Sequence, residues 1–267
     1  MTPREVTLAR GWGKADVHIH SAVGDGSATI REILDYVEYC TDLDLIAITD
    51  HDDIRGAQEA RELAARRNYS FDVIAGSEIS TLDGHLIALF IEKRVNMLQS
   101  LEKTVRAVHE QGGICIVPHP LSWLTFSVRY GKLRRVMANR WPGIYLDGIE
   151  TFNPSVAGRV AHERVKRLNE SLWHLPESGG SDAHHLAQIG TAHTVFEGHT
   201  AADFLLSLKE SRTMSHGRFW TANDHMQGIG TQSIKGLVIH PAYKIGRVIS
   251  SKWAELAGDE DSTSISL

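Results

Sequence analysis

Short apolar runs alternate with longer amphipathic stretches along most of this chain. The runs are four to six residues long and are bounded by polar residues or glycine, which is typical of strands buried in a sheet. The predicted strands are Ala15–His20, Leu45–Thr49, Val73–Gly76, Leu86–Ile91, Ile114–Val117, Gly148–Phe152, a short one ending at Gly180–Ser181, and Ala192–Phe196.

Between these strands, apolar residues recur at the spacing of an α-helix. The predicted helices are Thr29–Cys40, Ile54–Arg67, Met97–Gln111, Gly158–Ser171 and Thr200–Glu210. Thr29 is followed three residues later by Glu32, the spacing of a reciprocal capping box, so the first helix should begin there. Because strands and helices alternate, the sequence predicts an α/β fold built on a parallel sheet or barrel.

Composition places the chain among ordinary globular proteins. Of its 267 residues, 42% are hydrophobic and 23% charged, enough for a large core, and the net charge of -5 argues against general polyanion binding. The two cysteines, Cys40 and Cys115, exclude a disulfide scaffold and favour a reducing, cytoplasmic location. No apolar run approaches the roughly 20 residues that cross a bilayer, so we expect no membrane association. No obligatory protein partner is evident.

The alternating pattern also predicts the domain organisation. It continues to Arg212 and then fades into a segment with glycine and aromatic residues. We therefore expect a barrel domain over residues 1–211 and a C-terminal extension over 212–257 that packs on the barrel. Residues 258–267 are acidic and serine-rich, which predicts a disordered tail.

Potential metal ligands lie at nearly every predicted strand end. In parallel α/β folds, the loops after the strands open onto one face, where catalytic groups collect. Side chains at alternate positions of a strand share a face, so those of Asp16, His18 and His20 should point the same way. The later candidates are His51 with its neighbours Asp50, Asp52 and Asp53, then Glu78, His85, His119, Glu150, Asn153, Asp182, His184 and His185.

Each of these residues alone has an ordinary interpretation. A histidine after a strand is usually a loop residue, and Asp52 or Asp53 fits the N-cap of the next helix. Six or seven such placements in one chain are not expected by coincidence. Buried carboxylates and imidazoles need compensating charge, and divalent cations supply it. With 15 histidines and two cysteines in the chain, nitrogen and oxygen ligands suited to Mn, Fe or Zn are predicted.

Five short motifs, in order, resemble those of the PHP (polymerase and histidinol phosphatase) family. They are Asp16-Val17-His18-Ile19-His20, Thr49-Asp50-His51-Asp52, Gly76-Ser77-Glu78-Ile79, His119-Pro120 and Ser181-Asp182-Ala183-His184. The resemblance implies a distorted (β/α)7 TIM-like barrel with a di- or trinuclear metal site at the C-terminal ends of the strands. It also implies phosphoester hydrolysis by a metal-activated hydroxide.

The same resemblance implies nine metal ligands for two or three divalent ions. One ion would be held by His18, His20, Glu78 and Asp182. Glu78 would bridge to a second ion, completed by His119 and His85. A third ion would be held by Asp25, His51 and His184.

Candidates for binding the substrate phosphate are arginines, because guanidinium groups grip phosphate bidentately. The stretch Leu121–Leu146 has five basic residues and no acidic one. The candidate residues are Arg129, Arg134, Arg135 and, outside this stretch, Arg159. Two histidines near the last motif, His185 and His193, are candidates for the general acid that protonates the leaving group.

The expected substrate is a phosphomonoester, a nucleotide or a short oligonucleotide. The nearest alternative, a 5′-3′ exonuclease, needs a groove lined with basic residues, which Leu121–Leu146 permits locally. Histidinol-phosphate phosphatase is a further alternative. An amidohydrolase-type C–N hydrolase also begins with His-x-His, but it usually has a bridging lysine where this chain has Glu78. A catalytically silent metal-binding domain is disfavoured because the ligand set is complete.

Overall fold

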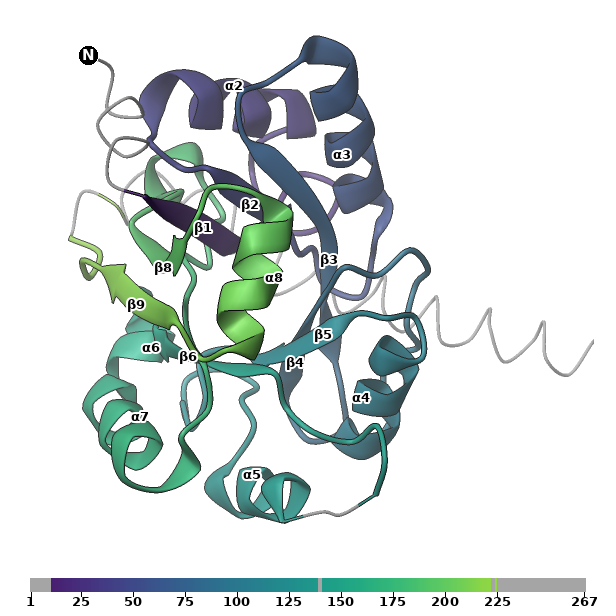
Figure 1. Ribbon diagram of the computed structural model, residues 1–267, viewed down its shortest axis with the longest axis vertical. Helices are drawn as coiled ribbons and strands as arrows, with labels where there is room; N and C mark the ends of the chain where they lie inside the picture. The colour runs from purple at the N-terminus through teal and green to yellow at the C-terminus, as the bar shows by residue number, and fades with distance from the viewer. Residues whose placement is uncertain (1–10, 139–140, 222–223, 225–267) are drawn as a thin grey trace, which may run out of the picture. The chain divides into compact units, whose positions relative to one another are not determined.

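The strands form one curved sheet. A computed structural model describes residues 11–138, 141–221 and 224 (Figure 1). Its strands are β1 (Trp12–Ile19), β2 (Leu45–Ile48), β3 (Asp72–Ser80), β4 (His85–Leu89), β5 (Ile114–Val117), β6 (Gly148–Phe152), β7 (Glu177–Gly179), β8 (Ala192–Glu197) and β9 (Thr213–Gly217). All eight predicted strands are present, and β9 is one that the pattern did not indicate. The predicted extension over 212–257 and tail over 258–267 lie largely outside the described residues and stay predictions.

The sheet is mixed and nearly closed. Its strand order is β7-β6-β5-β4-β3-β2-β1-β8-β9, with β4 antiparallel to both neighbours and β8 antiparallel to β1 and β9. The two ends of this order meet, because Thr213 Oγ1 donates a hydrogen bond to the Glu177 carbonyl at 2.7 Å and the hydroxyls of Ser178 and Thr194 lie 3.1 Å apart. The distorted barrel is confirmed. The antiparallel β4 follows from a turn too short for a parallel crossover.

Helices pack on the outside of this sheet and across one opening. They are α2 (Ile30–Cys40), α3 (Arg55–Arg67), α4 (Leu101–His109), α5 (Tyr130–Met137), α6 (Val156–Arg159), α7 (His162–Leu168) and α8 (Ala201–Lys209), with a π-helical turn η1 (Asn169–Trp173) and a 3-10 turn η2 (Leu186–Gln188). Figure 1 shows α2 and α3 beside β1–β3, and α4, α5 and α7 around the other half. Across the described part of the chain, no helix is long and apolar enough to span a membrane.

The helix boundaries follow local capping. The predicted capping box of Thr29 and Glu32 is present at the start of α2. The predicted helix over Met97–Gln111 begins later, at Leu101, because Ser100 caps the backbone amide of Lys103. The predicted helix over Gly158–Ser171 is divided into α6, α7 and η1.

The core has two parts, one on each face of the sheet. Along β2, Ile46 and Ile48 pack into the larger cluster with α2, α3, α4 and α5, whereas Leu45 and Ala47 pack into the smaller one. The smaller cluster includes Phe204 of α8, so this helix fills one opening of the barrel. Both faces of the strands are therefore buried, as expected where helices cover a sheet.

Candidate metal centre

The nine predicted ligands converge at the edge where the parallel strands end. They are His18 in β1, His20 and Asp25 after β1, His51 after β2, Glu78 in β3, His85 at the start of β4, His119 after β5, and Asp182 and His184 after β7. His85 reaches this edge because β4 runs antiparallel and pairs its first residue with Ser80, near the end of β3. One edge of the sheet thus collects side chains from six strands.

The carboxylate of Glu78 lies at the middle of this cluster and is almost fully buried. Its Oε1 atom lies 2.9 Å from Nδ1 of His85 and 3.0 Å from Nε2 of His119. Its Oε2 atom faces three further imidazoles at 3.2–3.4 Å, those of His18, His20 and His51. A carboxylate with ring nitrogens around both oxygens has the geometry of a bridging ligand.

Two more carboxylates complete the cluster on either side. Asp182 Oδ1 lies 3.4 Å from Nε2 of both His18 and His20. Asp25 Oδ2 lies 3.3 Å from Nε2 of His184, and the Oδ1 atom of the same residue lies 3.5 Å from Nδ1 of His20. The donor atoms fall into overlapping groups within 4.8 Å of one another, as neighbouring metal sites require.

Several ring nitrogens and one oxygen in the cluster are buried without a hydrogen bond. These atoms are His18 Nε2, His20 Nδ1, His20 Nε2, Asp25 Oδ1 and His85 Nδ1. A buried polar atom that makes no hydrogen bond is costly, and these atoms face one another at ion-pair distances instead. Imidazole nitrogens and carboxylate oxygens aimed at a common space fit divalent metal ions.

The pKa values of the cluster show how strongly its charges interact without a metal. Burial alone would lower the pKa of His20, but the nearby carboxylates of Asp182, Glu78 and Asp25 outweigh burial and raise the pKa to about 10. Burial alone would raise the pKa of the Asp25 carboxyl, but His184 and His51 hold it well below its ordinary range. The carboxylates therefore stay ionised, and positive charge is favoured among them.

Two residues without a predicted ligand role orient the imidazoles. Glu150 Oε1 lies 2.9 Å from Nδ1 of His18, and its Oε2 accepts a hydrogen bond from the backbone amide of His119 at 2.7 Å. The Ser127 hydroxyl lies 2.9 Å from Nδ1 of His119. Because Nδ1 of His18 and Nδ1 of His119 are engaged in these contacts, the Nε2 atom of each ring is directed at the cluster. Glu150 stood out only as a strand-end residue, and nothing in the sequence marked Ser127.

Backbone conformation around the cluster is strained. Asp52, His119 and Asp182 have φ values of 56°, 30° and 55°, a region that non-glycine residues seldom occupy. Strain of this kind persists where the surrounding structure fixes the chain, and it concentrates at functional sites. Two of the three residues are predicted ligands.

Asp16 does not join the cluster, contrary to the expected alternation along β1. The register between β1 and β2 shifts between Asp16 and Ile19, which interrupts the simple alternation of faces. The Asp16 carboxylate instead accepts hydrogen bonds from the backbone amides of Ser181 at 3.0 Å and Gly190 at 2.8 Å. Burial raises its pKa to about 6. Asp16 thus supports the backbone beneath the cluster.

The four candidate arginines have other neighbours in the structure. Arg134 and Arg135 lie on α5 and line hollows beside Glu102 and Trp141, which do not belong to the cluster. Arg159 stacks its guanidinium over the Phe219 ring, 5.1 Å from the centroid. Arg129 is exposed at the start of α5. Their assignment to substrate phosphate stays a prediction.

The two candidate general acids also differ in position. His185 directly follows His184, and its Nδ1 lies 2.8 Å from the hydroxyl of Ser27. His193 lies in β8, where burial lowers its pKa to about 4. An imidazole with this pKa is neutral near pH 7 and has no proton to donate as an imidazolium. The assignment of a general acid stays a prediction.

Sequence comparisons identify the family. A family model described as PHP-associated matches residues 161–213. An uncharacterised protein of Methanocaldococcus jannaschii is 34% identical over 175 residues, covering 61% of this chain and 94% of that protein. With this relative, the motifs and the barrel in agreement, the chain belongs to the PHP family.

Two relatives with named activities match shorter parts of the chain. The 5′-3′ exoribonuclease of Haemophilus influenzae is 31% identical over 105 residues, covering 38% of this chain and 37% of that enzyme. The 3′,5′-nucleoside bisphosphate phosphatase of Chromobacterium violaceum is 35% identical over 95 residues, covering 34% of this chain and 32% of that enzyme. The chain thus matches about a third of the length of each of these two relatives.

Solved structures show the same fold at low sequence identity. A two-domain protein of Bacteroides vulgatus containing a predicted PHP-like metal-dependent phosphoesterase superposes with a TM-score of 0.60 and 21% identity, covering 78% of this chain and 65% of that chain. A lesion-specific endonuclease of Pyrococcus furiosus superposes with a TM-score of 0.55 and 13% identity, covering 81% and 66%. At these identities the likeness concerns the fold alone.

Proposed function

We propose that this chain is a metal-dependent phosphoesterase that hydrolyses a phosphomonoester, a nucleotide or a short oligonucleotide. The observation that carries the proposal is the convergence of six imidazoles and three carboxylates on one buried space, with donor atoms that lack hydrogen bonds. Two relatives are named as an exoribonuclease and a nucleoside bisphosphate phosphatase, and these activities support attack at phosphorus rather than at carbon. Glu78 would take the bridging role that amidohydrolase-type enzymes usually give to a lysine, which disfavours C–N hydrolysis.

The donor set is suited to two or three ions of Mn, Fe or Zn. Glu78 would bridge two of them, one completed by His18, His20 and Asp182 and the other by His85 and His119. Asp25, His51 and His184 would hold the third. When bound, such ions supply Lewis acidity and lower the pKa of a coordinated water, so that water can attack phosphorus near neutral pH.

Residues around the metal centre would hold the metal-binding side chains in position. Glu150 and Ser127 fix the orientation of the His18 and His119 rings, so little reorganisation is needed when the substrate binds. In the reaction, the oxygen of water bonds to phosphorus, the phosphorus–oxygen ester bond breaks, and the departing oxygen takes a proton. We propose His185, which directly follows the predicted ligand His184, as the group that delivers that proton.

Hydrolysis of p-nitrophenyl phosphate by metal-supplemented protein tests the proposal. Glu78→Gln removes the bridging charge while keeping the side-chain size, and we expect activity to fall by at least about a hundredfold. The matched control is Glu62→Gln on the exposed surface of α3, where Glu62 pairs with Arg66 at 3.0 Å. Equal activity in both variants would overturn the assignment of the site.

A further inference from the structure

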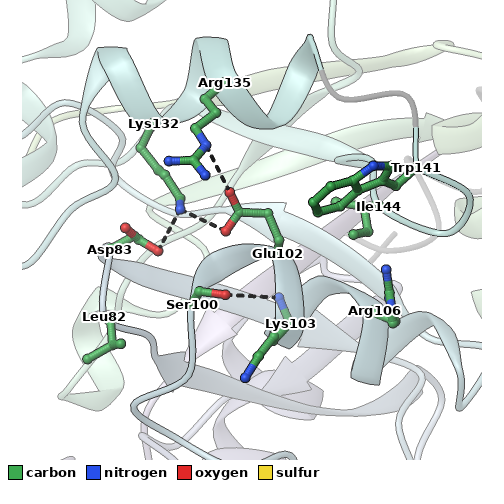
Figure 2. Close-up of a pocket in the computed structure, with 10 residues that line it drawn as sticks. All are labelled: Leu82, Asp83, Ser100, Glu102, Lys103, Arg106, Lys132, Arg135, Trp141 and Ile144. Carbon is green, nitrogen blue, oxygen red and sulfur yellow. Dashed lines mark hydrogen bonds and ion pairs between the residues drawn. The ribbon is translucent and has the colours of Figure 1, made fainter.

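A cleft between α4 and α5 lies outside the metal cluster and has a distinct chemical character. It has a volume of about 470 Å³ and runs from Leu82 and Asp83 at one end to Trp141 and Ile144 at the other (Figure 2). A second hollow, beside Arg134, shares Glu102, Arg135 and Trp141 with it. We call the two hollows together the α4–α5 cleft.

Basic side chains outnumber acidic ones in this cleft, although the chain as a whole is acidic. Its five basic residues are Lys103, Arg106, Lys132, Arg134 and Arg135, and its two acidic residues are Asp83 and Glu102. Both acids pair with Lys132, whose Nζ lies 3.0 Å from Asp83 and 2.7 Å from Glu102, and Glu102 also lies 3.7 Å from Nε of the more exposed Arg135. The exposed cations on both walls therefore make the cleft locally positive, which attracts a polyanion.

The cations are arranged in rows along the two helices. Lys103 and Arg106 are three residues apart on α4, and Lys132 and Arg135 are three residues apart on α5, so each pair shares a helix face. Repeated cations along a channel suit a ligand with repeated anions better than a single phosphate. Trp141, with 63% of its surface exposed, stands at one end of the cleft as a flat ring on which a base can stack (Figure 2).

The other end of the cleft is close along the chain to one predicted metal ligand. Asp83 lines the cleft, and the predicted ligand His85 is only two residues further along the same hairpin, so their Cα atoms are at most about 7 Å apart. The hairpin is held in place on both sides. The Asp83 carboxylate accepts a hydrogen bond from the Leu101 amide of α4, and the His85 amide donates to the Phe126 carbonyl.

We infer that the α4–α5 cleft binds the phosphodiester backbone of a single-stranded oligonucleotide whose terminal phosphate lies at the metal cluster. This inference rests on the proposed function and narrows its substrate class. Lys103, Arg106, Arg134 and Arg135 contact successive phosphates, and Trp141 stacks on a base. Arg134 and Arg135, from the basic stretch Leu121–Leu146, thereby contact phosphates beyond the reacting one.

Binding to metal-free full-length protein tests the cleft separately from catalysis. Fluorescence anisotropy with a labelled twelve-nucleotide oligothymidylate should give an affinity at least about tenfold higher than with a trinucleotide. The double variant Lys103→Gln/Arg106→Gln should weaken binding of the longer strand and reduce the slope of log K against log salt by about 1.4, or about 0.7 for each lost contact. Trp141→Ala should weaken binding with a smaller effect on this slope.

The matched control is Arg164→Gln/Lys166→Gln, which removes two exposed charges from α7. This pair should retain the binding of the parent protein. The inference is overturned if both double variants bind equally well, or if the trinucleotide or inorganic phosphate binds as tightly as the longer strand. If such a result were obtained while the protein still hydrolysed p-nitrophenyl phosphate, it would disprove oligonucleotide binding in the α4–α5 cleft. The proposed phosphoesterase function would be unaffected.

Discussion

Nδ1 of His18 lies 2.9 Å from Oε1 of Glu150, although the two residues are 132 positions apart in the sequence. Both side chains are almost fully buried. The contact fixes which ring nitrogen of His18 faces Glu78 and Asp182, and it joins the first strand of the barrel to the sixth. Several consequences for metal binding can be tested through this pair.

Replacing Glu150 with glutamine should weaken metal binding without removing a predicted ligand. The amide cannot stabilise the His18 ring as a carboxylate does, and we expect a loss of affinity of about 10- to 100-fold. Competition with a chromophoric chelator measures the change. Glu163→Gln, an exposed site on α7, is the control. Unchanged affinity in Glu150→Gln would show that Glu150 does not act on the metal site.

Gly180→Ala should disturb the same pair by crowding. A methyl group on Gly180 would clash with Oε1 of Glu150 and approach Cβ of His18 to 2.7 Å. We therefore expect lower metal affinity and lower activity. Gly131→Ala, which has open space around it, should leave metal affinity unchanged. If Gly180→Ala bound metal like the parent protein, the close packing described at this position would be wrong.

Metal binding should release protons and strengthen as the pH rises. In the metal-free protein His20 has a pKa of about 10, and the pKa values of His18 and His119 are also raised. With a pKa of about 10, the His20 ring is protonated at neutral pH, whereas a metal ligand must be neutral. Each proton displaced should raise apparent affinity by about tenfold per pH unit between about pH 6 and 8. Calorimetry in buffers of different ionisation enthalpy measures the release, and a buffer-independent enthalpy would contradict it.

His193 should contribute to unfolding in acid. Its pKa is lowered to about 4 by burial, so the native state binds fewer protons than the unfolded state at this position. Stability should therefore fall as the pH drops from about 6.5 through about 4, by up to about 3 kcal/mol. Urea unfolding with EDTA present at several pH values checks this. His193→Asn should flatten the dependence, while exposed His174→Asn should retain it; identical curves would contradict the assignment.

Much of the fold could be predicted because local patterns dominate it. Apolar runs such as Ile114–Val117 have both faces buried and therefore read as strands. The direction of β4 could not be predicted, because it depends on whether a turn or a crossover precedes it. β9 was missed because its pattern is weak: only Thr213 in it is buried, so the strand shows little apolar character.

Some residues of the candidate site could likewise be predicted from the sequence, and others could not. Its nine ligand candidates were found because they are strong donors at strand ends in a familiar order. Asp16 was misplaced because the register shift in β1 has no sequence signature. Ser127 was missed since its role depends on a loop that folds back on His119. The spacing of residues along the sequence does not predict contacts that form only in the tertiary structure.

The most direct test of the account is the metal content of the purified protein after loading with manganese and removal of unbound ions. Elemental analysis by mass spectrometry should give about two to three ions per chain, and Glu78→Gln should retain fewer. Fewer than one ion per chain in the parent protein would contradict the account, because the cluster would then have to be stable without the charge it is arranged to bind.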